Sequence, residues 1–168
     1  MKTKRQQGFS LIELLIVVAI IGIIAAIAIP NLLASRRAAN EGSALASMRV
    51  IFSSEATYQS TAGAGQYGSL ADLAAVGLID NVLSGATAAA TAKSGYVFSA
   101  ASVALAGQPA FDAGSSAAVH TSTSSVTGTG TRAFYTNESG VMYFNTTTAA
   151  PTCTATAART VTGTVLNN

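Results

Sequence analysis

Two hydrophobic patterns follow one another along the first third of the chain. Sixteen consecutive residues, from Leu14 to Ile29, carry no charged or polar side chain. A run of that length predicts a helix that lies in lipid or against an equally apolar partner. After Pro30, large apolar residues recur at three- and four-residue steps, which is typical of a helix with one buried face. This stripe consists of Leu32, Leu33, Leu45, Met48, Ile51, Phe52 and Tyr58.

Together the two patterns predict one helix from Phe9 to about Ser60. At 1.5 Å per residue it would be roughly 78 Å long, far longer than a soluble domain of this size needs. Pro30 removes a backbone hydrogen bond and Gly22 weakens the turns before it, so the helix is expected either to kink or to melt between them. We expect the charged residues of the second half to lie largely outside the stripe; they are Arg36, Arg37, Glu41, Arg49 and Glu55.

The rest of the chain begins with helix and turn signals. Residues 61–68 form a turn that contains glycine, and Ser69 can cap a short helix in which Asp72 takes the acidic third position. Gly77 ends this helix. We therefore expect a short helical segment between the long helix and the strands.

Strand patterns follow. Residues 95–99 and the two arms of a hairpin at 131–144 are rich in aromatic and β-branched residues, and Gly140 suits a left-handed position in the hairpin turn. Residues 113–130 are mostly Ser, Thr, Gly and Ala, which favours a loop or a poor edge strand, and residues 160–166 can add a last edge strand. The predicted fold class is α+β, with a long N-terminal helix packed on a small antiparallel sheet.

Composition narrows the choice of partners. Only 10% of the residues are charged, and three of the nine basic ones lie in residues 1–7, as Lys2, Lys4 and Arg5. From Phe9 onward, six Lys and Arg face seven Asp and Glu, so no basic field for nucleic acid is present. One cysteine, Cys153, excludes an internal disulfide and is expected to be a small buried residue.

Glu13 is the exception at the front of the apolar run. A lone carboxylate inside a membrane span costs roughly 2.5–3.5 kcal/mol on insertion scales and marks a functional site by default. A conventional signal peptide, cut near Ala26-Ile27-Ala28, and a plain uncleaved anchor both leave Glu13 and the Gly8-Phe9 pair unexplained. Solvation of Glu13 by lipid headgroups is the simpler alternative.

The residues Gly8-Phe9-Ser10-Leu11-Ile12-Glu13, followed by the apolar run, resemble the class III leader of type IV pilins and of type II secretion pseudopilins. The resemblance covers about residues 6–37 and implies cleavage by a membrane peptidase between Gly8 and Phe9. The same enzyme would N-methylate Phe9, the first residue of a 160-residue mature chain. In filaments of this family the helix is often melted where this chain has Gly22 and Pro30.

A physical reason supports a role for Glu13 beside the new terminus. A free α-amino group ordinarily has a pKa of about 7.7–8.0, so it is largely cationic at neutral pH. Phe9 and Glu13 are one helical turn apart, which would place the amine and the carboxylate on one face. The resemblance implies that the amine belongs to the neighbouring subunit, so that Glu13 sets the register of assembly; an intrachain pair remains the alternative.

The resulting hypothesis is a structural subunit of a type IV pilus, with a type II pseudopilin as the alternative and a membrane-anchored binding module as a remote one. The implied partners are further copies of the chain, related minor pilins, the prepilin peptidase and methylase, an inner-membrane assembly platform, and lipid before assembly. The precursor would lie in a bacterial inner membrane and the product in an extracellular pilus, or in the periplasm for a pseudopilin. The predicted regions are a cleaved leader (1–8), a transmembrane and filament-core helix (9–30), an amphipathic helix half (31–60) and a head (61–168).

No catalytic constellation or cofactor site is predicted. His120 is the single histidine and stands in a Ser/Thr tract, so a dyad with Cys153 lacks a third group. Asp112 or Glu138 would have to join backbone carbonyls to hold an ion, which the wide spacing of acids disfavours. Because Cys153 has no mate, we expect packing to hold the C-terminal region.

Overall fold

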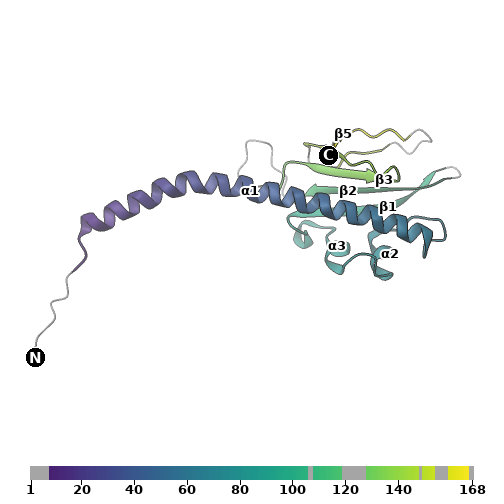
Figure 1. Ribbon diagram of the computed structural model, residues 1–168, viewed down its shortest axis with the longest axis horizontal. Helices are drawn as coiled ribbons and strands as arrows, with labels where there is room; N and C mark the ends of the chain where they lie inside the picture. Colours follow the sequence, from purple (N-terminus) through teal and green to yellow (C-terminus); the bar gives the residue numbers. More distant parts are fainter. Residues whose placement is uncertain (1–7, 106–107, 119–127, 148, 154–158, 167–168) are drawn as a thin grey trace, which may run out of the picture.

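The computed structural model describes residues 8–105, 108–118, 128–147, 149–153 and 159–166. One helix, α1 (Leu11–Ser60), runs through the molecule, and its first half projects far beyond the head (Figure 1). The helix begins two residues after the predicted Phe9 and ends at the predicted Ser60. The short helices α2 (Leu70–Ala75) and α3 (Asn81–Gly85) and the 3₁₀ turn η1 (Ala89–Thr91) come next.

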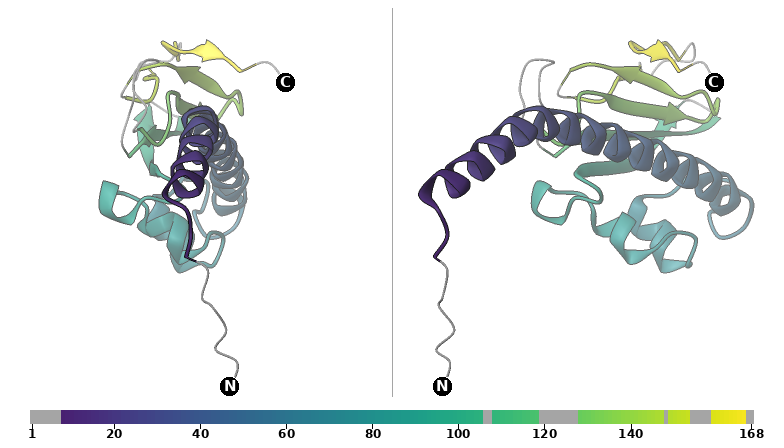
Figure 2. Two further views of the ribbon diagram at one scale, coloured as in Figure 1. Left: turned by 90° about the vertical axis from the view of Figure 1, so that its left-hand side faces the viewer. Right: turned by 60° about the vertical axis from the view of Figure 1, so that its left-hand side comes forward.

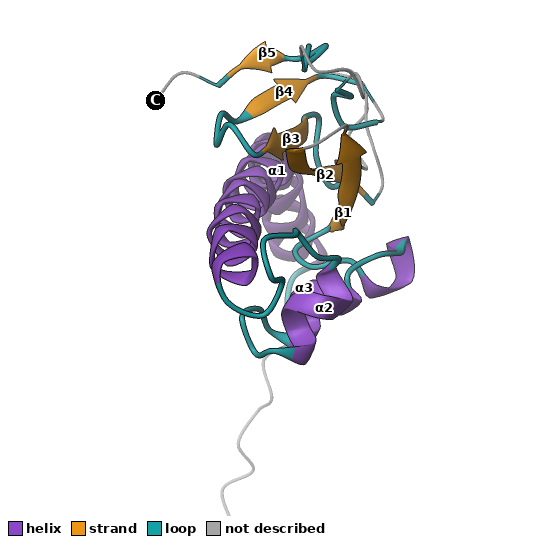
Figure 3. Ribbon diagram, turned by 90° about the vertical axis from the view of Figure 1, so that its right-hand side faces the viewer, coloured by secondary structure: helices purple, strands orange, loops and turns teal. Residues whose placement is uncertain are grey.

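The strands form one antiparallel sheet whose spatial order follows the chain, β1 to β5. Its members are β1 (Tyr96–Leu105), β2 (Gln108–Ala117), β3 (Ala133–Asn137), β4 (Tyr143–Asn145) and β5 (Thr164–Val165). The strands lie along one side of α1, and α2 and α3 lie against another side (Figure 3). The α+β prediction is therefore confirmed.

The core lies between the second half of α1 and the sheet. Met48 and Ile51 are 0% exposed, and they pack in one cluster with Leu73 of α2, Phe111 of β2 and Phe134 of β3. Three further residues of the predicted stripe are partly buried against this cluster: Leu45, Phe52 and Tyr58. The prediction of a buried stripe is wrong at its start. Leu32 is 53% exposed because the head does not reach that part of the helix.

The local turn and cap predictions agree with the structure. The N–H of Asp72 donates to the Ser69 hydroxyl at 3.3 Å at the start of α2. Gly77 and Gly140 have φ of 75° and 73°, values that favour glycine. Gly140 lies in the turn between β3 and β4, within the predicted hairpin, and β5 supplies the short edge strand expected within 160–166.

The expectation of a loop or poor edge strand from residue 113 onward was wrong for its first part. Residues up to Ala117 belong to β2, which pairs with β1 on one side and β3 on the other. Small residues are required there, because a Cβ added at Gly114 would lie 3.0 Å from the Cβ of Ala150. Close packing therefore favours glycine at this position of a paired strand; residues 119–127 of the tract lie outside the described part.

The expectation that the charged residues of α1 avoid the buried face was wrong for Glu55. This carboxylate is 0% exposed, and its Oε2 accepts the backbone N–H of Gly68 at 3.0 Å. The connection between α1 and α2 folds back over the end of the helix and supplies the donor. Helical periodicity alone gives no information on a donor that comes from a later loop.

Candidate assembly site on the N-terminal helix

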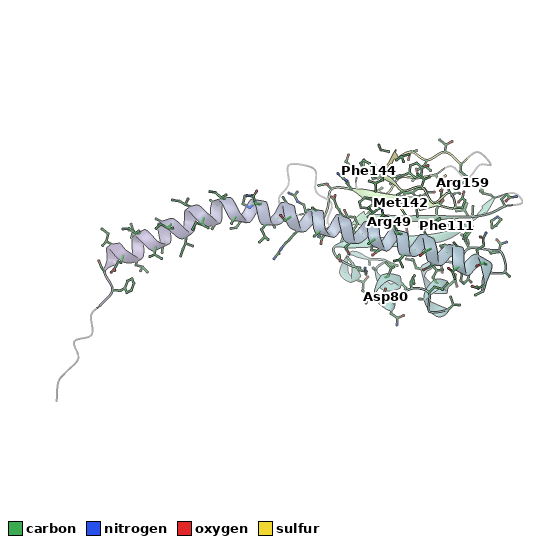
Figure 4. All side chains as sticks on the ribbon, viewed as in Figure 1. Arg49, Asp80, Phe111, Met142, Phe144 and Arg159 are labelled. Atoms are coloured by element: carbon green, nitrogen blue, oxygen red, sulfur yellow. The ribbon has the colours of Figure 1, made fainter. Side chains whose placement is uncertain are left out.

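The first half of α1 presents bare apolar surface to solvent. The large apolar side chains from Leu11 to Ile29 are 47–80% exposed, and they point outward on all sides of the helix (Figure 4). The helix is long and apolar enough to cross a membrane. A patch of this size is unusual for a water-exposed surface and indicates lipid or protein as its natural contact.

Glu13 lies in the first turn of this half. Its Oε2 accepts the backbone N–H of Ser10 at 3.3 Å, in the manner of a helix cap. A carboxylate is favoured there because the first N–H groups of a helix carry a partial positive charge. Glu13 therefore has a modest interaction within its own chain and remains open to solvent.

Phe9 lies ahead of the helix and is 80% exposed. The predicted spacing of one helical turn between Phe9 and Glu13 requires Phe9 to be helical, but α1 begins at Leu11 and Ser10 is extended, with φ −73° and ψ 138°. In this chain, where Gly8 still precedes Phe9, the pair is not arranged on one helical face.

Gly22 and Pro30 both lie inside a continuous helix. Of the two expected outcomes, a kink or a melted segment, the structure does not show the melted segment. The projecting half is inclined to the half that lies on the head (Figure 2), as expected for a helix that contains proline. A Cβ added at Gly22 would meet no atom within 4 Å. Packing within one chain therefore does not require glycine at this position.

The head begins to hold α1 at Asn40 and Glu41. The Asn40 amide donates to the carbonyl of Thr129 at 2.9 Å, and Glu41 Oε1 accepts from the N–H and the hydroxyl of Thr131 at 2.9 and 2.7 Å. Glu41 Oε2 lies 3.6 Å from Arg132 Nε. These contacts join residues about ninety positions apart, and no local pattern in the sequence indicated them.

The C-terminal segment is fastened to the sheet by ion pairs as well as by packing. Arg159 is 9% exposed; its Nη2 pairs with Asp112, and its Nε lies 3.0 Å from Glu138 Oε1. Although burial lowers the pKa of Arg159, the carboxylates of Asp112 and Glu138 outweigh it and raise that pKa. The expectation that packing alone holds this region was therefore incomplete, and both acids considered for an ion already face a guanidinium.

The other candidate groups offer little chemistry. Cys153 is half-buried, and its Sγ lies 3.9 Å from the Asn137 amide. His120 lies outside the described residues. In the part of the chain that the structure describes, no group of three or more His, Cys, Asp or Glu could hold a metal ion.

Comparison with known proteins shows what the N-terminal segment is similar to. Residues 3–29 match the prokaryotic N-terminal methylation motif. The chain is 63% identical over 38 residues to the type IV wide pilus major component PilA4 of Thermus thermophilus, and 43% identical over 54 residues to the type IV major pilin protein PilA of Myxococcus xanthus. Part of this chain is therefore similar to type IV pilins, and its N-terminal segment has the methylation motif.

The similarity to these two pilins covers only part of the chain. The two matches cover 23% and 32% of this chain, and the chain spans 29% and 24% of the lengths of those pilins. No solved structure is detectably similar. The resemblance to type IV pilins is thus confirmed by residues that include Gly8, Phe9 and Glu13, whereas the roles of these residues stay predictions.

Proposed function

We propose that this chain is a structural subunit of a type IV pilus. The observation that carries the proposal is the bare apolar half of α1, 47–80% exposed from Leu11 to Ile29, in a segment that matches the methylation motif. Two relatives of that segment are named as pilus components, which favours the pilus over a pseudopilin. The free energy for assembly would come from transferring this surface into a bundle of like helices.

Processing would precede assembly. The leader, residues 1–8, is removed after Gly8, and the new terminus at Phe9 is N-methylated by the prepilin peptidase. Residues 9–30 hold the chain in the inner membrane and then enter the filament core, residues 31–60 carry the head, and residues 61–168 form its body. An inner-membrane platform and minor pilins would assist.

Glu13 would then set the register between subunits. In a dry bundle the carboxylate gains strongly from the amine of a neighbouring Phe9, and breaking a buried pair of this kind costs about 3–5 kcal/mol. The weak cap to Ser10 is the interaction that Glu13 gives up. Between Gly22 and Pro30 the helix is the segment most easily melted when subunits pack.

The test combines the mature terminus with assembly. Mass spectrometry should find a chain that begins at methylated Phe9; a start at Met1, or beyond Ala28, would overturn the leader assignment. Glu13→Gln keeps the shape of the side chain and removes its charge. We expect normal amounts of this variant in the membrane fraction and a large loss from sheared surface filaments. Glu41→Gln is the matched control, because the Glu41 carboxylate bonds to the head of its own chain. Normal filaments with Glu13→Gln would remove the register role.

A further inference from the structure

Glu55 is a fully buried carboxylate in the head, and the assembly role proposed above does not use it. Its side chain leaves α1 one turn before the helix ends and is 0% exposed. Oε2 accepts the N–H of Gly68 at 3.0 Å, whereas Oε1 is buried and has no hydrogen-bond partner among the described residues. A half-satisfied buried carboxylate is costly when it is ionised.

The partner of Glu55 belongs to the connecting loop, residues 61–69, which joins α1 to α2. Within this loop the N–H of Gly63 donates to the carbonyl of Tyr58 at 2.7 Å, so the chain turns directly over the helix end. Gly68 is buried, and a Cβ there would lie 3.1 Å from both Asp72 Cβ and the Tyr58 ring. The loop therefore passes close to the carboxylate, and its position depends on the bond from Gly68.

Among the described residues, the groups that act on the pKa of Glu55 supply no positive charge. Asp72 of α2 and the phenol of Tyr67 in the connecting loop interact with it electrostatically, and Glu138, in the turn after β3, acts on the same phenol. The Glu138 carboxylate itself faces Arg159, which also pairs with Asp112. Ionised Glu55 thus faces the carboxylate of Asp72, and one backbone N–H, from Gly68, compensates it among the described residues.

We propose that Glu55 is a proton-binding site that controls how firmly the connecting loop is held on α1. Protonated, the carboxyl is neutral, it keeps the bond from Gly68, and no buried charge remains. Ionised, it places a buried negative charge with a single hydrogen-bond donor under the loop and favours conformations in which water reaches Oε1. The proposal concerns the head alone and holds whether or not the chain assembles.

The direction of the pH dependence follows from burial. Burial raises the pKa of Glu55 above its ordinary value of 4.5, the Gly68 N–H lowers it, and Asp72 raises it, with a net increase. The folded head therefore keeps this proton in a pH range where the unfolded chain has lost it. The stability that this proton contributes is fully present below pH 4.5, is lost as the pH rises through the folded pKa, and shows no further change above it.

The first experiment measures the melting temperature of the full chain in detergent micelles from pH 4 to pH 8. We expect Tm of the wild type to fall by about 5 °C over this range because of Glu55, in line with the usual sensitivity of small domains. Glu55→Gln keeps the acceptor for Gly68 and should abolish that part of the fall. An unchanged slope in Glu55→Gln would overturn the proposal.

A second measurement uses the wild-type chain, so it does not depend on whether a variant folds. The side-chain carboxyl of Glu55 is followed by carbon-13 NMR in the wild type, together with hydrogen exchange of the Gly68 amide corrected for its intrinsic pH dependence. The proposal requires a carboxyl midpoint above pH 4.5 and weaker protection of Gly68 above that midpoint. A midpoint at or below 4.5, or protection that does not change across it, would contradict the proposal.

Discussion

The two halves of α1 have the same secondary structure and opposite surroundings. In the first half, large apolar side chains are 47–80% exposed; in the second half, Met48 and Ile51 are 0% exposed. A helix satisfies most of its backbone hydrogen bonds internally, which is what allows it to move between lipid and protein. The first half is therefore free to change its contacts, while the second half is committed to the sheet.

The three carboxylates of α1 show the same division. Glu41 accepts two bonds from Thr131, and Glu55 accepts one from Gly68, so both act within the head. Among the described residues, Glu13 bonds to the N–H of Ser10, three residues away. Of the three, Glu13 is the acid that a partner can recruit without unfolding the head.

The largest expected effect comes from matched truncations in the two halves. Ile51→Ala removes a fully buried side chain and should lower the free energy of unfolding of the head by about 2–5 kcal/mol. Ile21→Ala removes the same atoms from a side chain that is 59% exposed and should leave this free energy unchanged. Denaturant titration of the micellar chain, followed by tyrosine fluorescence, measures both; similar losses would mean that the two halves share one core.

A smaller effect is expected from matched changes of arginine. Arg159→Gln leaves Asp112 and Glu138 without their shared guanidinium and should cost about 2 kcal/mol, the scale of hydrogen bonds to charged groups. Arg36→Gln, on the exposed surface of α1, should change stability by less than about 0.5 kcal/mol. The same titration at low and high salt measures both, and equal effects would show that Arg159 does not fasten the C-terminal segment.

The smallest effect is local to the free half. Gly22→Ala should stabilise the surrounding helix by about 1 kcal/mol, because alanine loses less backbone entropy and meets no atom there. Hydrogen exchange of neighbouring amides should slow about fivefold, which is that energy expressed as an equilibrium. Exchange in β2 and β3 should stay the same; slower exchange there as well would mean that the two halves unfold together.

The sequence predicted features that depend on neighbouring residues. Apolar periodicity predicted the helix to Ser60, Ser69 and Asp72 predicted the cap of α2, and Gly140 predicted the hairpin turn. In each case the physical cause lies within a few positions of the residues that signal it. The methylation motif was found for the same reason, since the segment is short and contiguous.

Features that depend on distant pairing were missed. Residues 113–117, the start of the Ser/Thr/Gly/Ala tract, have weak strand propensity. They nevertheless belong to β2, which is an interior strand because it pairs on both edges. Glu55 is buried by a loop thirteen residues later, and Arg159 reaches Asp112 across 47 positions. A single sequence contains no local signal for such contacts, so the charged residues of the head were placed less well than its helices.

Pro30 lies within α1 without ending it, and this has a consequence for the carbonyl of Ala26. Proline has no amide hydrogen, so this oxygen lacks the donor that a helix normally provides four residues later. Water can bind the oxygen when the helix is wet, but in hydrocarbon an orphaned carbonyl is expensive. A neighbouring helix that brings a hydroxyl to this depth, or leaves space for one water molecule, would therefore fit better than a purely aliphatic one.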